Sequence, residues 1–284
     1  MLDAIKTIVN ESNYDVGIYV SDTKGNEVKY NENKMFEAAS CIKLFILIEY
    51  FKQVYEKKIK IDDTFTYNES DNITGVNSGI ISSLDYGLKL TSKDYATLMI
   101  IYSDNIATNK LIEYLGIEKI NNTIKELGFK DTILFNKLDL LKYFKFGQTT
   151  PYEYARAYRM ILNNEIVNEE VSKNILEILK KQKHNDMLVK GLDNLDVLFK
   201  GSDKSKINFI ASKSGTIISI IDDLKNARHD GGIISTTYGD YIISLFISDI
   251  DDLQFNYDNK AIELGGKVSE IVYKAFIENK GELR

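Results

Sequence analysis

The chain has 284 residues, 44% hydrophobic and 27% charged, which is typical of a globular protein with a substantial core. Its formal net charge of −6 argues against nucleic acid or an anionic membrane surface as the main partner. One cysteine excludes an internal disulfide, and two distant histidines disfavour a zinc site, so we expect neither metal nor cofactor. We find no apolar stretch long enough for a membrane span and no signal peptide, which predicts a cytoplasmic protein or an exported one supplied without its signal.

The N-terminal part predicts a helix, a hairpin and a second helix. The first helix is short and amphipathic, and it precedes the strand YDVGIYVSD, the turn TKGN and the strand EVKYN. A helix is then expected from about Ser40 to Tyr55. It is apolar almost all round, as in a helix buried inside a domain.

The middle of the chain, from about residue 91 to 194, has a mostly helical pattern. Thr91 and Asp94 resemble a capping box at a helix start, and Gly116 is placed to end the next helix. Thr150 is expected to cap a further helix in which Pro151, the only proline, takes the first position.

The pattern after Gly201 changes to strands. INFIASKSG, GGIISTT and YIISLFIS predict one antiparallel sheet, and the chain closes with a helix. We therefore predict an α/β protein of the α+β sandwich type, a single domain over residues 1–284. Its sheet lobe comprises about 1–36 and 200–284 with the terminal helices, and about 37–199 form an inserted all-helical lobe.

A lysine within the apolar helix is the first chemical signal. Lys43 follows Ser40 by three residues, so the two side chains share a helix face. Burial favours the neutral amine of a lysine, and a neutral amine can activate a serine hydroxyl. The pattern S-x-x-K is weak by itself, because it also occurs at Ser21 to Lys24 in a turn.

Two further motifs add to this signal. YSDN at residues 102–105 lies between two predicted helices, and KSGT at residues 213–216 ends a predicted strand. In this order, the three motifs resemble those of the serine β-lactamase and penicillin-binding protein superfamily, with class A β-lactamases the most similar. Alternatively, Ser103 and Asn105 merely cap a helix, and KSG is a plain strand end.

The resemblance implies a β-lactamase-like catalytic domain and a role for each matching residue. Ser40 would be the acylated nucleophile and Lys43 its base or proton relay, while Ser103 would pass a proton to the departing nitrogen. Asn105 would bind Lys43 or the substrate's side-chain amide. Lys213, the fourth catalytic residue, would hold Ser103 and the substrate carboxylate electrostatically. Ser214, Gly215 and Thr216 would bind the substrate, with the backbone N–H groups of Ser40 and Thr216 as the oxyanion hole.

One part of the class A pattern is missing. The family's deacylating glutamate falls near Leu138, and the segment from Thr132 to Thr150 contains no glutamate. Asp139 is one position away. It is either a substitute base or an ordinary exposed loop charge.

Two residues near the motifs have open roles. Arg228 is either a second clamp for a substrate carboxylate or a solvated loop arginine. We expect Asp230 to tie its strand in place and Cys41 to be a core thiol, because position 41 points about 100° away from Ser40 on a helix.

We therefore predict a serine hydrolase that forms an acyl-enzyme and hydrolyses the amide bond of a β-lactam. The alternatives are a penicillin-binding D,D-peptidase or esterase-like enzyme, and a sensor or binding module that deacylates slowly. The expected partner is a small acyl substrate, a β-lactam, peptide or ester, and the expected oligomeric state is a monomer.

Overall fold

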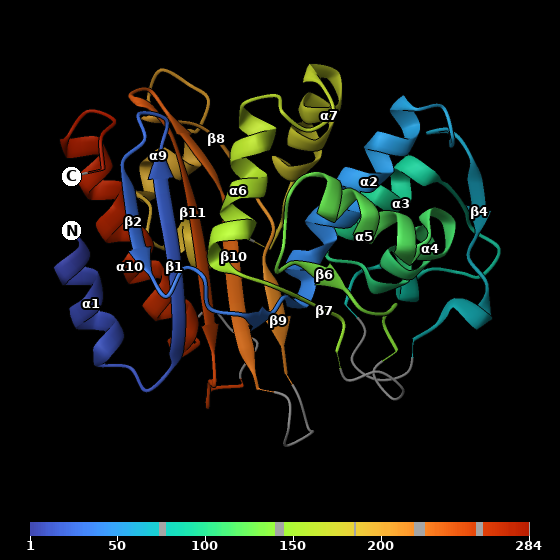
Figure 1. Ribbon diagram of the computed structural model, residues 1–284, viewed down its shortest axis with the longest axis horizontal. Helices are drawn as coiled ribbons and strands as arrows, with labels where there is room; N and C mark the ends of the chain where they lie inside the picture. The colour runs from blue at the N-terminus through green and yellow to red at the C-terminus, as the bar shows by residue number, and fades with distance from the viewer. Residues whose placement is uncertain (74–77, 140–144, 185, 219–224, 254–257, 284) are drawn as a thin grey trace. The chain divides into compact units, whose positions relative to one another are not determined.

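The structure, a computed structural model, describes residues 1–73, 78–139, 145–184, 186–218, 225–253 and 258–283. The chain forms two compact units (Figure 1). The sheet unit comprises Met1–Cys41, Thr150–Arg159 and Asn185–Arg284, and the helical unit comprises Ile42–Thr149 and Met160–His184.

An antiparallel sheet forms the centre of the sheet unit. Its strands have the order β2-β1-β11-β10-β8, and β9 also pairs with β10. The strands are β1 (Asp15–Asp22), β2 (Glu27–Tyr30), β8 (Ile207–Ser212), β9 (Gly215–Ile217), β10 (Ala227–Thr236) and β11 (Gly239–Ser248). The predicted hairpin β1–β2 is therefore confirmed, and β10 pairs with β11 in the antiparallel sheet predicted for the C-terminal strands.

The two faces of this sheet carry different side chains, because successive residues of a strand point to opposite faces. Ile243, Leu245 and Ile247 of β11 belong to the main apolar core, together with buried residues of the helices. These helices are α1 (Leu2–Asn10), α8 (Asp186–Lys190) and α10 (Lys260–Glu278), and α9 (Asn194–Leu198) lies between α8 and β8 in the chain. The alternate residue Phe246 instead contacts Tyr154 of α6 (Pro151–Leu162), at 5.5 Å between ring centroids.

The helical unit is built around the helix α2 (Lys43–Tyr55). Its other helices are α3 (Ser92–Ile101), α4 (Asn105–Leu115), α5 (Ile117–Glu126) and α7 (Glu169–Leu179). Two short antiparallel pairs accompany them, β4 (Thr64–Thr66) with β5 (Lys89–Thr91), and β6 (Ile133–Leu134) with β7 (Gly147–Thr149). The 3₁₀ turns are η2 (Glu69–Asp71) and η3 (Ile81–Ser83).

The predicted helix signals are confirmed. Thr91 and Asp94 form the capping box at the start of α3. Gly116 ends α4 with a φ of 89°, which a residue with a Cβ rarely adopts. Thr150 Oγ1 accepts the backbone N–H of Glu153 at 3.1 Å, and α6 begins at Pro151.

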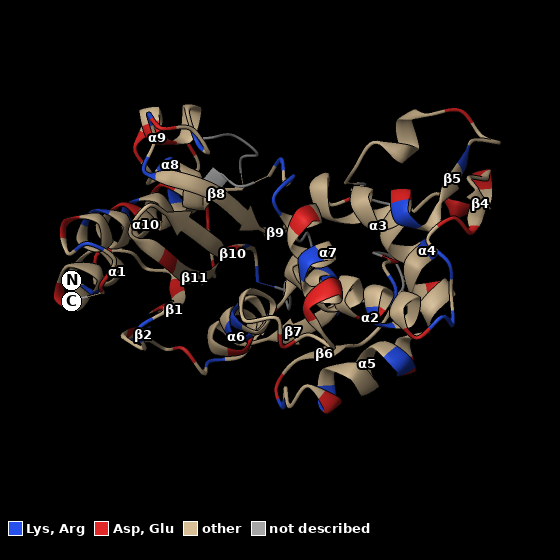
Figure 2. Cartoon of the chain, turned by 90° about the horizontal axis from the view of Figure 1, so that it is seen from above, with Lys and Arg blue, Asp and Glu red and all other residues tan. Residues whose placement is uncertain are grey.

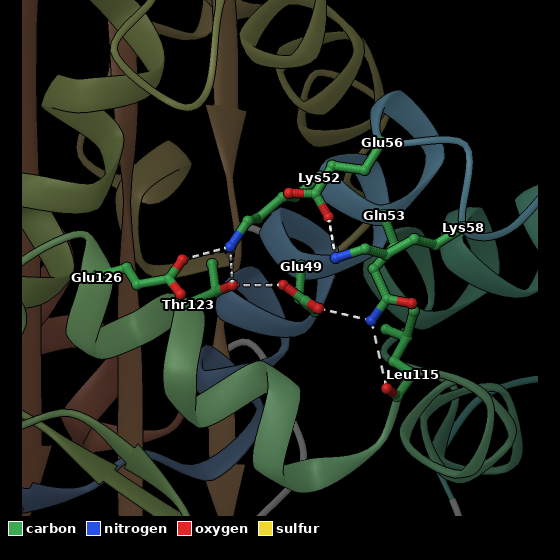
Figure 3. A network of polar contacts seen from close by, with 8 residues as sticks. All are labelled: Glu49, Lys52, Gln53, Glu56, Lys58, Leu115, Thr123 and Glu126. Atoms are coloured by element: carbon green, nitrogen blue, oxygen red, sulfur yellow. Dashed lines mark hydrogen bonds and ion pairs between the residues drawn. The ribbon is translucent and has the colours of Figure 1, made fainter.

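The helix α2 is buried on nearly all sides, as its apolar sequence predicts, and it carries a buried carboxylate as well as a buried lysine. Glu49 is 3% exposed and accepts hydrogen bonds from Gln53 Nε2 and Thr123 Oγ1, each at 2.5 Å (Figure 3). Lys52 donates to the same threonine at 2.8 Å and pairs with Glu126. This network joins α2 to α5 and satisfies the buried charge.

The predicted start of this helix is wrong by one turn. Residues Ala39–Ile42 form the 3₁₀ turn η1, and the α-helix begins at Lys43. Cys41 N–H donates to Ala38 O, and Ala39 has a φ of 49°, which is outside the right-handed helical region. Ser40 therefore lies in a separate tight turn.

Figure 2 shows basic and acidic residues interspersed along the helices, for example along α5. The helices in the described part of the chain are all too short or too polar to cross a membrane.

Candidate active site

The turn that carries Ser40 rests on strand β9 in the sheet unit. A Cβ on Gly215 would lie 3.0 Å from the backbone nitrogens of Ser40 and Cys41, so any other residue there would push against the turn. The short strand β3 (Phe36–Glu37) leads into the turn. Ser40 itself is half-buried.

Lys43 is completely buried in the helical unit, and oxygens of Ser103 and Asn105 surround its amino group. Nζ donates to Ser103 O at 2.7 Å, to Asn105 Oδ1 at 2.8 Å and to Ser103 Oγ at 3.2 Å. The structure thus brings together three predicted site residues. Of the two partners predicted for Asn105, Lys43 is the one observed here.

The loop between α3 and α4 is held in place by Asp104. Its Oδ1 accepts Ala107 N–H at 2.8 Å and caps α4, and its Oδ2 accepts the N–H groups of Ile80 and Ile81 at 2.8 and 2.9 Å. Asp104 is therefore the helix cap, and the alternative that Ser103 or Asn105 serves only as a cap is wrong. Ser103 has a φ of 54°, a strained conformation for a residue with a Cβ. The hydrogen bonds of the next residue, Asp104, hold the backbone in this conformation.

The KSGT residues lie where β8 ends and β9 begins. Lys213 is completely buried, Ser214 is half-buried, and Thr216 is exposed. Tyr154 Oη donates to Lys213 O at 2.5 Å. Burial lowers the pKa of Lys213 from its ordinary value of 10.5 to about 8, although the charges of Cys41 and Asp230 oppose this shift.

Arg228 is not a loop residue. It lies within β10, directly opposite Thr216, and is 4% exposed, so the solvated-loop alternative is wrong. Asp230 on the same strand accepts Leu188 N–H at 3.2 Å and Gly231 N–H at 2.9 Å, which ties the strand to α8 as expected.

Cys41 is a core thiol, as predicted from its position. It is fully buried, and Sγ donates to Lys213 O at 3.7 Å. Burial raises the pKa of Cys41 to about 12, so the thiolate form is disfavoured at neutral pH.

The sequence analysis missed the residue that fixes position 138. Asn109 Oδ1 accepts Leu138 N–H at 2.7 Å, and Asn109 Nδ2 donates to Leu138 O at 2.7 Å. Asn109 is four residues after Asn105 on α4, so both side chains are on one helix face. This spacing was the available signal, and it places Leu138 on the same side of α4 as Asn105.

Asp139 is the next residue along this loop. It is half-buried and lines a cavity of about 170 Å³ together with Asn109, Lys110 and Leu138. It is therefore partly sheltered by the helical unit. Residues 140–144 of the segment from Thr132 to Thr150, which has no glutamate, lie outside the described residues.

The chain belongs to the β-lactamase enzyme family, whose sequence profile matches residues 2–276. β-Lactamase BRO-1 of Moraxella catarrhalis is 23% identical over 270 residues, covering 93% of this chain and 80% of the relative. A β-lactamase of Bacteroides uniformis is 22% identical over 280 residues, covering 95% and 89%.

Solved structures share the fold over nearly the whole chain. A β-lactamase from Sphaerobacter thermophilus has a TM-score of 0.82 at 23% identity, covering 100% of this chain and 98% of its own. PBP-A has a TM-score of 0.80 at 25% identity, with 98% and 96% covered. A class A β-lactamase from Mycobacterium abscessus has a TM-score of 0.81 at 17% identity, with 97% and 98% covered.

These similarities confirm the predicted family and the predicted α+β, β-lactamase-like fold. They also support the predicted class of activity, a serine β-lactamase-type hydrolase that acts on β-lactams. The matches concern the family and the fold. The roles of individual side chains stay predictions.

We predict that Asp104→Ala lowers the free energy of unfolding by about 3 kcal/mol, because three backbone N–H groups, two of them in buried hydrogen bonds, lose their acceptor. The exposed capping residue Asp94 gives a matched control, and Asp94→Ala should cost about 1 kcal/mol. Urea unfolding of both variants and the wild type measures the difference. An equal cost for the two variants would contradict the tie through Asp104.

Proposed function

We propose that Ser40 is the nucleophile that a β-lactam acylates and that Lys43 accepts its proton. The observation that carries this proposal is the buried Nζ of Lys43, bound by the oxygens of Ser103 and Asn105. A general base needs a fixed position and a path for its proton, and Ser103 Oγ at 3.2 Å supplies the next group in that path.

In the proposed acylation step, Lys43 starts as the neutral amine. Ser40 Oγ attacks the lactam carbonyl carbon and gives its proton to the lone pair of Lys43 Nζ. The carbonyl oxygen becomes an oxyanion that the backbone N–H groups of Ser40 and Thr216 stabilise. The C–N bond then breaks. The proton moves through Ser103 to the departing nitrogen, which leaves a serine ester and restores the base.

The proposed binding residues complement an anionic substrate. Lys213 and Arg228 would attract the carboxylate of a penicillin, and Ser214 would donate a hydrogen bond to it. Gly215 would contribute by letting the Ser40 turn lie against the strand, because it has no Cβ.

A second candidate function is a penicillin-binding protein whose acyl-enzyme persists. The observation that favours it is Leu138, an apolar side chain at the position clamped by Asn109. Deacylation needs a base that activates water, and Asp139 is the neighbouring candidate. A variant of PBP-A, 24% identical to this chain, has been solved as an acyl-enzyme complex with penicillin G.

Intact-protein mass spectrometry after addition of penicillin G tests the nucleophile. We expect the wild type to gain the mass of the drug and Ser40→Ala to gain none, because the ester needs Oγ. Loss of the adduct within seconds, while the drug is consumed, would indicate a β-lactamase. An adduct that lasts for hours would indicate the penicillin-binding alternative. Acylation of Ser40→Ala would refute the assignment.

We predict that Leu138→Glu speeds deacylation by at least about tenfold, because it places a carboxylate at a backbone position that Asn109 fixes. Leu138→Gln is the matched control, since its side chain has nearly the same shape and is no base. The decay of the acyl-enzyme after removal of free drug measures both. Equal rates for the two variants would contradict a catalytic position at residue 138.

The same decay assay tests Asp139 in the wild-type loop. If its carboxylate activates water, Asp139→Asn should prolong the life of the acyl-enzyme by about tenfold or more. An unchanged lifetime would identify Asp139 as an ordinary loop charge.

The acylation rate constant should fall as the pH rises through about 8. Burial lowers the pKa of Lys213 to about 8, so its cation is present below this pH and is lost above it. Lys213→Arg is the control, because a guanidinium stays charged across this range and should remove the alkaline fall. Rate constants at low penicillin concentration between pH 6 and pH 10 measure the effect. A fall that persists in Lys213→Arg would assign it to another group.

A further inference from the structure

The turn of residues 38–41 adopts a backbone conformation that its own sequence does not favour. Ala39 has a φ of 49°, in the left-handed region that residues with a Cβ rarely adopt. Ala39 directly precedes Ser40. Strain of this kind persists only where the surrounding structure holds the chain in place.

Three contacts within the sheet unit surround this turn. Gly215 lies against the backbone nitrogen of Ser40, and the Cys41 thiol donates to Lys213 O at 3.7 Å. The third contact is made by His229, whose Nε2 lies 3.0 Å from Glu37 O at the entrance to the turn. It is the only one of the three in which a side chain of β10 reaches this segment.

The hydrogen bonds of His229 require one tautomer. Nδ1 accepts the N–H of Ile247 at 3.2 Å, so the ring proton is on Nε2 and is donated to Glu37 O. The ring is 2% exposed and stacks on Phe246 at 4.3 Å between centroids. Burial lowers the pKa of His229 to about 4, so the neutral form is present at neutral pH.

The same residue also aligns the strand beneath the turn. His229 is directly opposite Gly215 in the β9–β10 pair, so the two residues face the same side of the sheet. His229 is thus the register partner of the glycine against which Ser40 lies, and it also contacts Glu37, which precedes the turn.

We propose that His229 is a positioning residue for the nucleophile: its Nε2–H···O bond to Glu37 holds the strained turn in which Ser40 and its backbone N–H are presented to the substrate. This inference rests on the proposed function of Ser40. It assigns to His229 no contact with the substrate, so its effect must pass through the turn.

Two substitutions separate the two hydrogen bonds. His229→Gln carries an amide nitrogen as far from Cα as Nε2, so it can still donate to Glu37 O. His229→Asn carries its amide oxygen near the place of Nδ1, so it can accept from Ile247 N–H but does not reach Glu37. Both variants lose the ring that stacks on Phe246, which makes them a matched pair. Ile243→Val, in the core on the other face of the sheet, controls for a general loss of stability.

Two measurements on each protein test the effect of the substitutions. The first is the acylation rate constant with penicillin G, followed by mass spectrometry. We expect His229→Asn to be slower by about tenfold or more and His229→Gln to stay within about threefold of the wild type, since small errors of position are costly in catalysis. The second is hydrogen exchange at the Cys41 amide, which donates to Ala38 O inside the turn. Exchange should be faster in His229→Asn only.

The outcomes separate the inference from the function on which it rests. Equal acylation by the wild type and His229→Asn would overturn the positioning role, and so would equal losses in His229→Asn, His229→Gln and Ile243→Val. If the wild type is not acylated at all, the proposed function fails. The exchange data then decide the positioning role alone, which is overturned if the Cys41 amide exchanges equally in all four proteins.

Discussion

The burial of the Lys43 amino group is the constraint on which the helical unit depends. A buried amino group is costly unless nearby oxygens replace the lost water. Here the replacement comes from the loop between α3 and α4, which supplies Ser103 O, Ser103 Oγ and Asn105 Oδ1. The loop must therefore be rigid. Asp104 makes it so by binding three backbone N–H groups, two of them from the start of η3.

The sheet unit also contains a residue in a strained backbone conformation that its surroundings hold in place. Ser103 and Ala39 are both non-glycine residues with positive φ, and each is either a predicted site residue or the neighbour of one. In each case the neighbouring segment is tightly fixed. A Cβ on Gly79 would lie 2.1 Å from the Asp104 carboxylate, just as one on Gly215 would meet the Ser40 turn.

Local patterns in the sequence predicted the elements well, because their causes are local. The capping box at Thr91, the end of α4 at Gly116 and the start of α6 at Pro151 each depend on residues within one turn. The motifs also indicated the family, since they state residue type and order. The turn around Ser40 was predicted as regular helix because its 3₁₀ form depends on contact with β9, which is far away in sequence.

Side chains that act through distant backbone groups were the ones the sequence did not reveal. Arg228 and His229 read as a polar segment before a strand, yet both are buried inside β10. Asn109 binds a loop residue 29 positions further on, and His229 binds a carbonyl 192 positions earlier. The hydrophobic periodicity of the sequence does not indicate such pairs. They follow from the strand register and from the placement of the loop on α4.

The two half-reactions of an acyl-enzyme depend on different parts of this chain. Acylation needs the nucleophile, its base and the proton path, and the residues proposed for these roles are all present. Deacylation needs a base at the loop that Asn109 holds, and there the clamp binds only backbone atoms of Leu138. A backbone clamp fixes a position without requiring a particular side chain. This loop can therefore exchange a glutamate for a leucine while its fold is kept, and the lifetime of the acyl-enzyme can change independently of its formation.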